Sequence, residues 1–261
     1  MKILFIGDIV GKPGRRAVQT LMPEIVNRYE IDLTVANCEN AAGGFGITRD
    51  VVEELFQTNI HVLTTGNHTW DKKETEDFIG DYENLLRPAN YPPGVPGFGH
   101  TLVSDASGNS VGVINLMGRV FMRPIDCPFR TAEAEIDKMP SSTKIIIVDM
   151  HAEATSEKLA MGWFLDGRVS AVLGTHTHVQ TADERIFSNG TAYITDAGMT
   201  GPFESIIGVH KENVMERFLT GIPKRFDVAK KDVWLQGVVI DVDETTGKSR
   251  SIERINLKYR D

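Results

Sequence analysis

Residues 60–71, IHVLTTGNHTWD, join an apolar segment to a polar turn, and the same arrangement recurs along the chain. The first six residues, which are mostly β-branched or apolar, predict a buried strand. Gly66 then turns the chain, and Asn67 and His68 follow at once. An amide and an imidazole therefore lie at the carboxyl end of the predicted strand, where the chain opens into a loop.

Apolar runs of this kind alternate with amphipathic segments of helical period through the rest of the sequence. The alternation is typical of a layered α/β fold. Strands are predicted at residues 2–7, 32–37, 60–65, 100–104, 110–116, 144–151, 169–176 and 191–198, and two more within 233–259. Helices are predicted at residues 14–30, 48–57, about 155–165 and 210–219, with a short one within 72–81.

Three local features refine the predicted boundaries of these elements. Pro23 lies within the first predicted helix and predicts a kink or the start of a second segment, because proline removes a backbone hydrogen bond. Thr48 precedes the second predicted helix and is a suitable N-cap. Residues 87–99, RPANYPPGVPGFG, are rich in proline and glycine and predict irregular chain. Since strands resume at residue 100, we expect a surface loop within a single domain spanning residues 1–261.

Length and charge limit the class of partner. The chain has 261 residues, of which 41% are hydrophobic, which is enough for a substantial core. Its formal net charge of −8 argues against binding long nucleic acids, because that affinity comes largely from neutralised phosphates. A small anionic substrate in a locally positive pocket remains compatible with this charge.

Cysteine usage and hydropathy predict a cytoplasmic protein. Cys38 and Cys127 are too few for a disulfide framework and suit a reducing compartment. The N-terminal MKILFIGD is too short for the apolar core of a signal peptide. No apolar run approaches the ~20 residues that a membrane span requires, so we expect no membrane partner.

The predicted strands end in polar side chains of one chemical kind. In open α/β sheets, ligands bind beyond the carboxyl ends of the strands, so these groups are expected to converge. Carboxylate, amide and imidazole groups are the ligands that divalent metals of hard and borderline character prefer. His176 and His178 are two residues apart and would face the same way on an extended chain. The set comprises Asp8, Glu39, Asn40, Asn67, His68, His151, His176 and His178, with Asp196 as a further strand-end acid in a supporting role.

Competing motifs are not met by the sequence. Only three residues separate Gly7 from Gly11 in GDIVGKPGR, one fewer than a phosphate-binding P-loop requires. AAGGFGIT, residues 41–48, does not supply the GxGxxG of a dinucleotide site, and no GxSxG nucleophile elbow is present. The ligand set favours metal-assisted phosphoester hydrolysis and does not choose the ester.

The motifs at the strand ends resemble those of a known family. Asp8, Glu39-Asn40, GNH at 66–68, His151 and THTH at 175–178 follow the order of the motifs in calcineurin-like metallophosphoesterases. The chain departs from the broad pattern at Val10, in NCEN and at Thr69. With these departures, FIGDIVGKPGR, ANCENAAGG, TTGNHTWD and GTHTHVQTAD are similar to the bacterial YmdB-like branch.

The resemblance implies a fold, an activity and a ligand set. The fold would be a four-layer αββα sandwich of two mixed sheets, and the activity that of a 2′,3′-cyclic nucleotide phosphodiesterase with two metal ions. Iron is implied, although manganese and zinc accept the same ligands. Asn40 would fill the coordination place left by Val10, while His68 would be the proton donor and not a ligand. By resemblance, the first metal has Asp8, Asn40 and His178, the second has Asn67, His151 and His176, and Glu39 bridges.

Several readings stay open on the sequence alone. The same scaffold suits a phosphomonoester or phosphoprotein phosphatase, and a complete ligand set also suits a regulatory protein that binds metal and nucleotide with little turnover. Arg119, Arg123 and Arg130 in GRVFMRPIDCPFR could contact phosphate or could line a solvated loop. A homo-oligomer is compatible with the resemblance.

Overall fold

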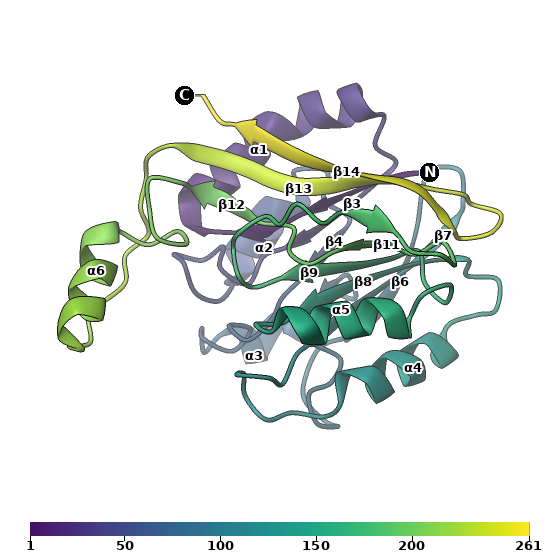
Figure 1. The fold of residues 1–261 in the computed structure, drawn as a ribbon, viewed down its shortest axis with the longest axis horizontal. Helices are drawn as coiled ribbons and strands as arrows, with labels where there is room; N and C mark the ends of the chain where they lie inside the picture. The colour runs from purple at the N-terminus through teal and green to yellow at the C-terminus, as the bar shows by residue number, and fades with distance from the viewer. Residues whose placement is uncertain (261) are drawn as a thin grey trace.

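Two β-sheets lie face to face between layers of helices in the computed structural model, which describes residues 1–260 (Figure 1). The first sheet has the order β2 (Asp8–Ile9), β12 (Met199–Pro202), β13 (Val233–Val242), β1 (Lys2–Ile6), β3 (Leu33–Asn37), β4 (Val62–Thr64) and β5 (Leu85–Leu86), and β14 (Ser249–Lys258) pairs with β13. The second has the order β10 (Arg185–Ile186), β11 (Ala192–Ile194), β9 (Ala171–Thr175), β8 (Ile145–His151), β7 (Ser110–Met117) and β6 (His100–Ser104).

Both sheets are mixed, and each has a parallel centre. β1, β3, β4 and β5 run parallel, with Phe5 opposite Val35, whereas β13 runs antiparallel to β1. In the second sheet β7, β8, β9 and β11 run parallel, and β6 and β10 are antiparallel edge strands. The carboxyl ends of the parallel strands in each sheet therefore lie along one edge.

The central core lies between the sheets. Phe5 and Val35 of the first sheet pack in one buried cluster with Val113 and Ile147 of the second. Successive side chains of a strand point to opposite faces, so Leu4 lies on the outer face instead, among residues from the helices. Burial on both faces explains why these strands read as continuous apolar runs in the sequence.

Helices cover the outer face of each sheet, which confirms the predicted four-layer αββα sandwich. Buried side chains of α1 (Gly11–Tyr29) and α2 (Arg49–Phe56) pack on the first sheet. Those of α4 (Pro128–Lys138) and α5 (Thr155–Phe164) pack on the second. α3 (Thr75–Phe78) is a single turn, and α6 (Lys211–Thr220) stands away from the sandwich (Figure 1).

Several elements differ from the predictions. α1 begins at Gly11 and continues through Pro23 as one helix, so no second segment starts there. The N-cap is confirmed, because the Thr48 hydroxyl accepts the Val51 N–H at 3.4 Å. α4 and the short strands β2, β5, β10 and β12 were not predicted. α4 begins at Pro128. Proline suits the first turn of a helix, but in a sequence it is equally typical of a loop, so this helix was missed.

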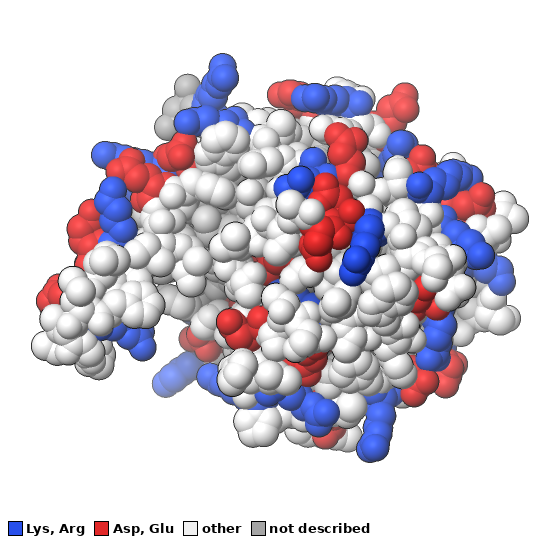
Figure 2. Space-filling model, viewed as in Figure 1, with Lys and Arg blue, Asp and Glu red and all other residues white. Residues whose placement is uncertain are grey.

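Surface charge on the face drawn in Figure 2 is mixed. Basic and acidic side chains are interspersed there and form no continuous basic stripe (Figure 2). Within residues 1–260 no helix is both long and apolar enough to cross a membrane.

Candidate metal centre and its cavity

The predicted ligand residues come together where the carboxyl ends of the two sheets meet. Asp8, Glu39 and Asn67 follow or lie within strands of the first sheet, whereas His151 ends β8 and His176 follows β9 of the second. The N–H of His176 donates to Asp8 Oδ2 at 3.1 Å, which joins the two sheets directly. Two residues that are 168 positions apart in the chain thus become neighbours.

On one side of the centre, three groups approach a single nitrogen of His151. Its Nε2 lies 2.9 Å from Asn67 Oδ1, 3.1 Å from His176 Nδ1 and 3.2 Å from Glu39 Oε1. One imidazole nitrogen can satisfy only one of them as donor or acceptor. The ligand atoms of Glu39, His151 and His176 all lie within 4.8 Å of one another, so a shared cation would fit their chemistry.

On the other side, a buried carboxylate oxygen lacks a hydrogen-bond partner. Asp8 is fully buried, and its Oδ1 accepts no hydrogen bond within residues 1–260, although His178 Nε2 lies 3.7 Å away. Asn40 Nδ2 lies 3.1 Å from the same His178 nitrogen and donates to Glu39 Oε1 at 3.3 Å. An unpartnered buried carboxylate oxygen is costly, so this donor set also fits a cation.

The charges of these buried groups depend on one another. Burial alone would raise the pKa of Glu39, but the nearby His151 and His68 lower it to about 2. Burial alone would lower the pKa of His151, but the Glu39 carboxylate raises it to about 9. Burial raises the pKa of Asp8, and burial with the charge of His151 lowers the pKa of His176 to about 3.

A third buried acid, Asp149, orients the His151 ring through the Thr175 hydroxyl. Asp149 accepts hydrogen bonds from the hydroxyls of Thr64 and Thr175 and from Asn37 Nδ2. The Thr175 hydroxyl also lies 2.9 Å from His151 Nδ1, which leaves Nε2 toward the other candidate ligand residues. Such outer contacts fix the tautomer and direction of a ligand imidazole. Asp149 was not predicted as a site residue, although it precedes His151 by two residues on the same face of β8.

Asp196 holds the loop that carries His176 and His178, in the supporting position predicted for it. Its carboxylate pairs with Lys158 Nζ of α5 at 2.8 Å, and both side chains are fully buried. The same Oδ2 accepts the N–H and the hydroxyl of Thr177, at 3.0 and 2.7 Å. His176 and His178 both have positive φ, which is uncommon for residues other than glycine, so this loop needs external support.

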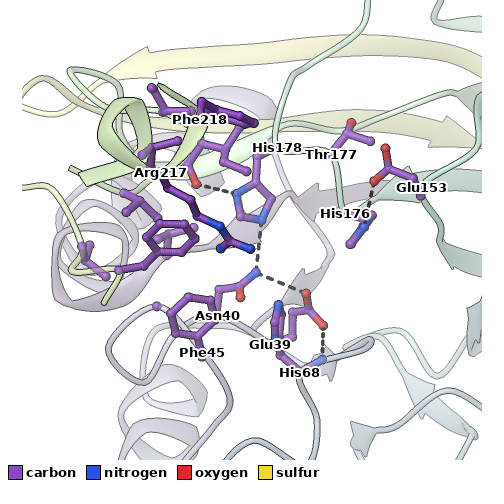
Figure 3. A pocket seen from close by; sticks show the side chains of 18 residues that line it. Glu39, Asn40, Phe45, His68, Glu153, His176, Thr177, His178, Arg217 and Phe218 are labelled. Atoms are coloured by element: carbon purple, nitrogen blue, oxygen red, sulfur yellow. Dashed lines mark hydrogen bonds and ion pairs between the residues drawn. The ribbon is translucent and has the colours of Figure 1, made fainter. Parts of the chain in front are cut away.

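A cavity of about 520 Å³ opens beside these residues (Figure 3). Glu39, Asn40, His68, His176 and His178 line it on one side. His68 Nδ1 lies 2.6 Å from Asp71 Oδ2, and the His68 ring lies edge-on to Phe45 with centroids 5.2 Å apart. His68 therefore lies at the cavity, beside the candidate ligands. Its partner Asp71 was not predicted, although it is only three residues away in the sequence.

The cationic side chain of this cavity is Arg217 of α6, not one of the arginines singled out in the sequence. Arg119, Arg123 and Arg130 are not among the lining residues. No local feature of HKENVMERFL distinguishes Arg217 from a solvated helical arginine. Only the tertiary structure, in which α6 lines the cavity, reveals it.

Comparison with known proteins gives consistent relatives over nearly the whole chain. A family model described as YmdB-like protein matches residues 4–255. The 2′,3′-cyclic-nucleotide 2′-phosphodiesterase of Bacillus subtilis (strain 168) is 54% identical over 255 residues, which cover 98% of this chain and 96% of that protein.

Two solved structures agree with the fold. A protein from Thermus thermophilus is 41% identical with a TM-score of 0.93, and all of both chains is covered. A structure from Mycoplasma pneumoniae, described as a novel phosphatase, is 34% identical with a TM-score of 0.93, covering 99% of this chain and 93% of that one.

Proposed function

Because this chain belongs to the YmdB-like protein family, we propose that it is a phosphodiesterase that hydrolyses 2′,3′-cyclic nucleotides to nucleoside 3′-phosphates. The observation that carries the proposal is the approach of Asn67, His176 and Glu39 to one nitrogen of His151, beside a cavity that Glu39 and His176 line. The high identity to a phosphodiesterase of that specificity supports the choice of ester.

The contacts support a division of the ligand residues into two groups with Glu39 between them. Glu39 Oε1 lies 3.2 Å from His151 Nε2 on one side and 3.3 Å from Asn40 Nδ2 on the other. A half-turn of the Asn40 amide would present its oxygen in place of its nitrogen. The first group is Asp8, Asn40 and His178, and the second is Asn67, His151 and His176.

The two groups would hold two metal ions, with iron as the proposed metal and manganese or zinc as alternatives. Such ions, when bound, supply an activated water and stabilise charge on the phosphate. The neighbouring residues then have to bind and orient the cyclic ester and supply a proton to the leaving 2′-oxygen. A ribose alkoxide is a poor leaving group, so this proton is needed as the P–O bond breaks.

His68 is the proposed proton donor. Its Nδ1 lies 2.6 Å from Asp71 Oδ2, which orients the ring, and its backbone N–H donates to Glu39 Oε2 at 3.0 Å, which holds the main chain of His68 beside the candidate ligands. A protonated His68 keeps the Nδ1–H bond to Asp71 and still has Nε2–H to offer. After the bond breaks, the ring is neutral and can accept a proton from solvent.

His68→Ala tests this role. Turnover of 2′,3′-cyclic AMP should fall by ~10²–10⁴, the usual scale of acid–base catalysis, while elemental analysis finds unchanged metal. Bis(p-nitrophenyl) phosphate should be affected much less, because p-nitrophenolate leaves without needing a proton. Loss of metal together with activity would instead make His68 a ligand and contradict the assignment.

A substrate panel tests the activity itself. Anaerobically purified protein should hydrolyse 2′,3′-cyclic AMP in proportion to its metal content and should act weakly on p-nitrophenyl phosphate. Preference for that monoester would identify a phosphatase. Binding of the nucleotide without turnover by metal-loaded protein would identify a regulatory protein.

A further inference from the structure

The cavity beside the candidate metal centre has a second, apolar wall on the side away from the strand ends. Loops and α6 build it, and it includes an exposed aromatic side chain. We define the apolar wall by its principal side chains, which are Phe45, Ile207, Val214, Phe218, Phe226 and Val228. A phosphate alone would need none of these groups, so the wall suits a ligand with an apolar, flat part.

The apolar wall is joined to the candidate metal centre. The backbone carbonyl of Ile207 lies 3.0 Å from Nδ1 of His178, whose other nitrogen faces Asp8 and Asn40. Val214 is buried and anchors α6 toward the body of the protein, although the rest of that helix is largely exposed. A ligand bound by the centre would therefore reach the apolar wall without crossing open solvent.

Arg217 lies between the two parts of the cavity. Its guanidinium carbon lies 5.1 Å from the centroid of the Phe226 ring, and in Figure 3 the guanidinium points toward His178 and Asn40. Within residues 1–260 no carboxylate forms an ion pair with Arg217. A planar cation stacked on a ring and directed at a candidate metal centre suits a phosphate oxyanion.

Phe218 is the feature that a purely structural role does not explain. The residue is 79% exposed, yet it lines the cavity with Phe45 and Phe226. Aromatic rings with one free face are the usual stacking partners of nucleobases, and such contacts tolerate different bases because each base has a π-face.

We propose that the apolar wall is the nucleobase subsite, in which Phe218 stacks on the base, and that Arg217 contacts the cyclic phosphate. This inference rests on the proposed function, because it places the ester at the candidate metal centre. It predicts selectivity for cyclic phosphates that carry a base over cyclic phosphates that do not.

The test compares 2′,3′-cyclic AMP with glycerol 1,2-cyclic phosphate, which has the same five-membered ring and no base. In Phe218→Ala, the ratio of kcat/KM for the nucleotide to kcat/KM for the glycerol ester should fall ~10-fold, the scale of one lost base–aromatic contact, mainly through KM. Leu219→Ala is the matched control, since Leu219 is also 79% exposed on α6 but does not line the cavity. Its ratio should be unchanged.

Arg217→Ala should lower kcat/KM for both esters by a similar factor and leave their ratio unchanged, because both carry the phosphate. A readout without turnover is calorimetric binding of 3′-AMP and of inorganic phosphate. Phe218→Ala should weaken binding of 3′-AMP only, whereas Arg217→Ala should weaken binding of both.

The outcomes separate this inference from the proposed function. If the wild-type protein hydrolyses neither ester, the proposed function fails. If it hydrolyses both but Phe218→Ala leaves the ratio and the 3′-AMP affinity unchanged, the subsite is wrong. If Phe218→Ala changes only the oligomeric mass in light scattering, the side chain packs against a second copy of the chain and the subsite is likewise overturned.

Discussion

Lys158→Met should strongly destabilise the protein, because it removes the cation from a buried ion pair. Lys158 Nζ lies 2.8 Å from Asp196 Oδ2, and neither side chain is exposed. Methionine is flexible and fills irregular core space, so the substitution leaves little cavity. Its main effect is to leave the Asp196 carboxylate buried without a counter-ion.

The magnitude follows from the remaining partners of Asp196. Breaking a buried ion pair on one side costs ~3–5 kcal/mol. Asp196 still accepts hydrogen bonds from both the N–H and the hydroxyl of Thr177 and from the N–H of Gly198. We therefore expect the lower end, about 3 kcal/mol in the free energy of unfolding. The double variant Lys158→Met/Asp196→Asn also removes the carboxylate charge. It should be more stable than Lys158→Met by ~1 kcal/mol or more, which is within the range of coupling energies between contacting residues.

Urea unfolding followed by circular dichroism measures these changes. Lys211→Met is the control, since its pair with Glu204 at 3.1 Å is exposed on both sides and its loss should leave the free energy of unfolding nearly unchanged. If Lys158→Met lowers the free energy of unfolding by no more than this control does, the buried ion pair does not stabilise the protein as expected. A double variant that is no more stable than Lys158→Met alone would also refute the reasoning, because the cost would then not lie in the stranded carboxylate.

Two further predictions concern Gly66 and His61. A Cβ at Gly66 would lie 2.2 Å from Cδ2 of His151. Gly66→Ala should therefore lower the free energy of unfolding by ~1–3 kcal/mol and reduce the metal content. Gly80→Ala is the control, because its Cβ would meet nothing closer than 4.0 Å, and it should change neither quantity. Normal metal content by elemental analysis in Gly66→Ala would contradict this. The Thr34 N–H donates to Nδ1 of His61 at 3.0 Å, and burial lowers the pKa of that imidazole below 6.5. The unfolded chain then binds the proton more readily, so stability should fall as pH falls through about 6.5, and His61→Asn should reduce this slope in urea titrations. An unchanged slope would show that another group carries the dependence.

The sequence by itself determined the α/β class and the polar ends of the strands, whereas the four layers were expected from the family resemblance. The strands Lys2–Ile6 and Ile145–His151 are buried on both faces, so their apolar runs were visible without any knowledge of neighbours. The donor side chains follow those runs directly, and the carboxyl ends of parallel strands share an edge, which is why their convergence could be predicted. Thr48 could be predicted as a cap for a similarly local reason, since its partner is three residues away.

Only the tertiary structure decided which groups support and surround that centre. Lys158 has the sequence context of an ordinary helical lysine, and it becomes a buried ion-pair partner only because α5 packs its face on the second sheet. Arg217 and Phe218 belong to a helix whose amphipathic pattern does not say what it lies beside. Helical and strand periods report which side of an element is buried, whereas contacts between segments distant along the chain depend on how the elements pack. The convergence of the strand-end side chains could therefore be predicted from the sequence, and the cavity with its apolar wall could not.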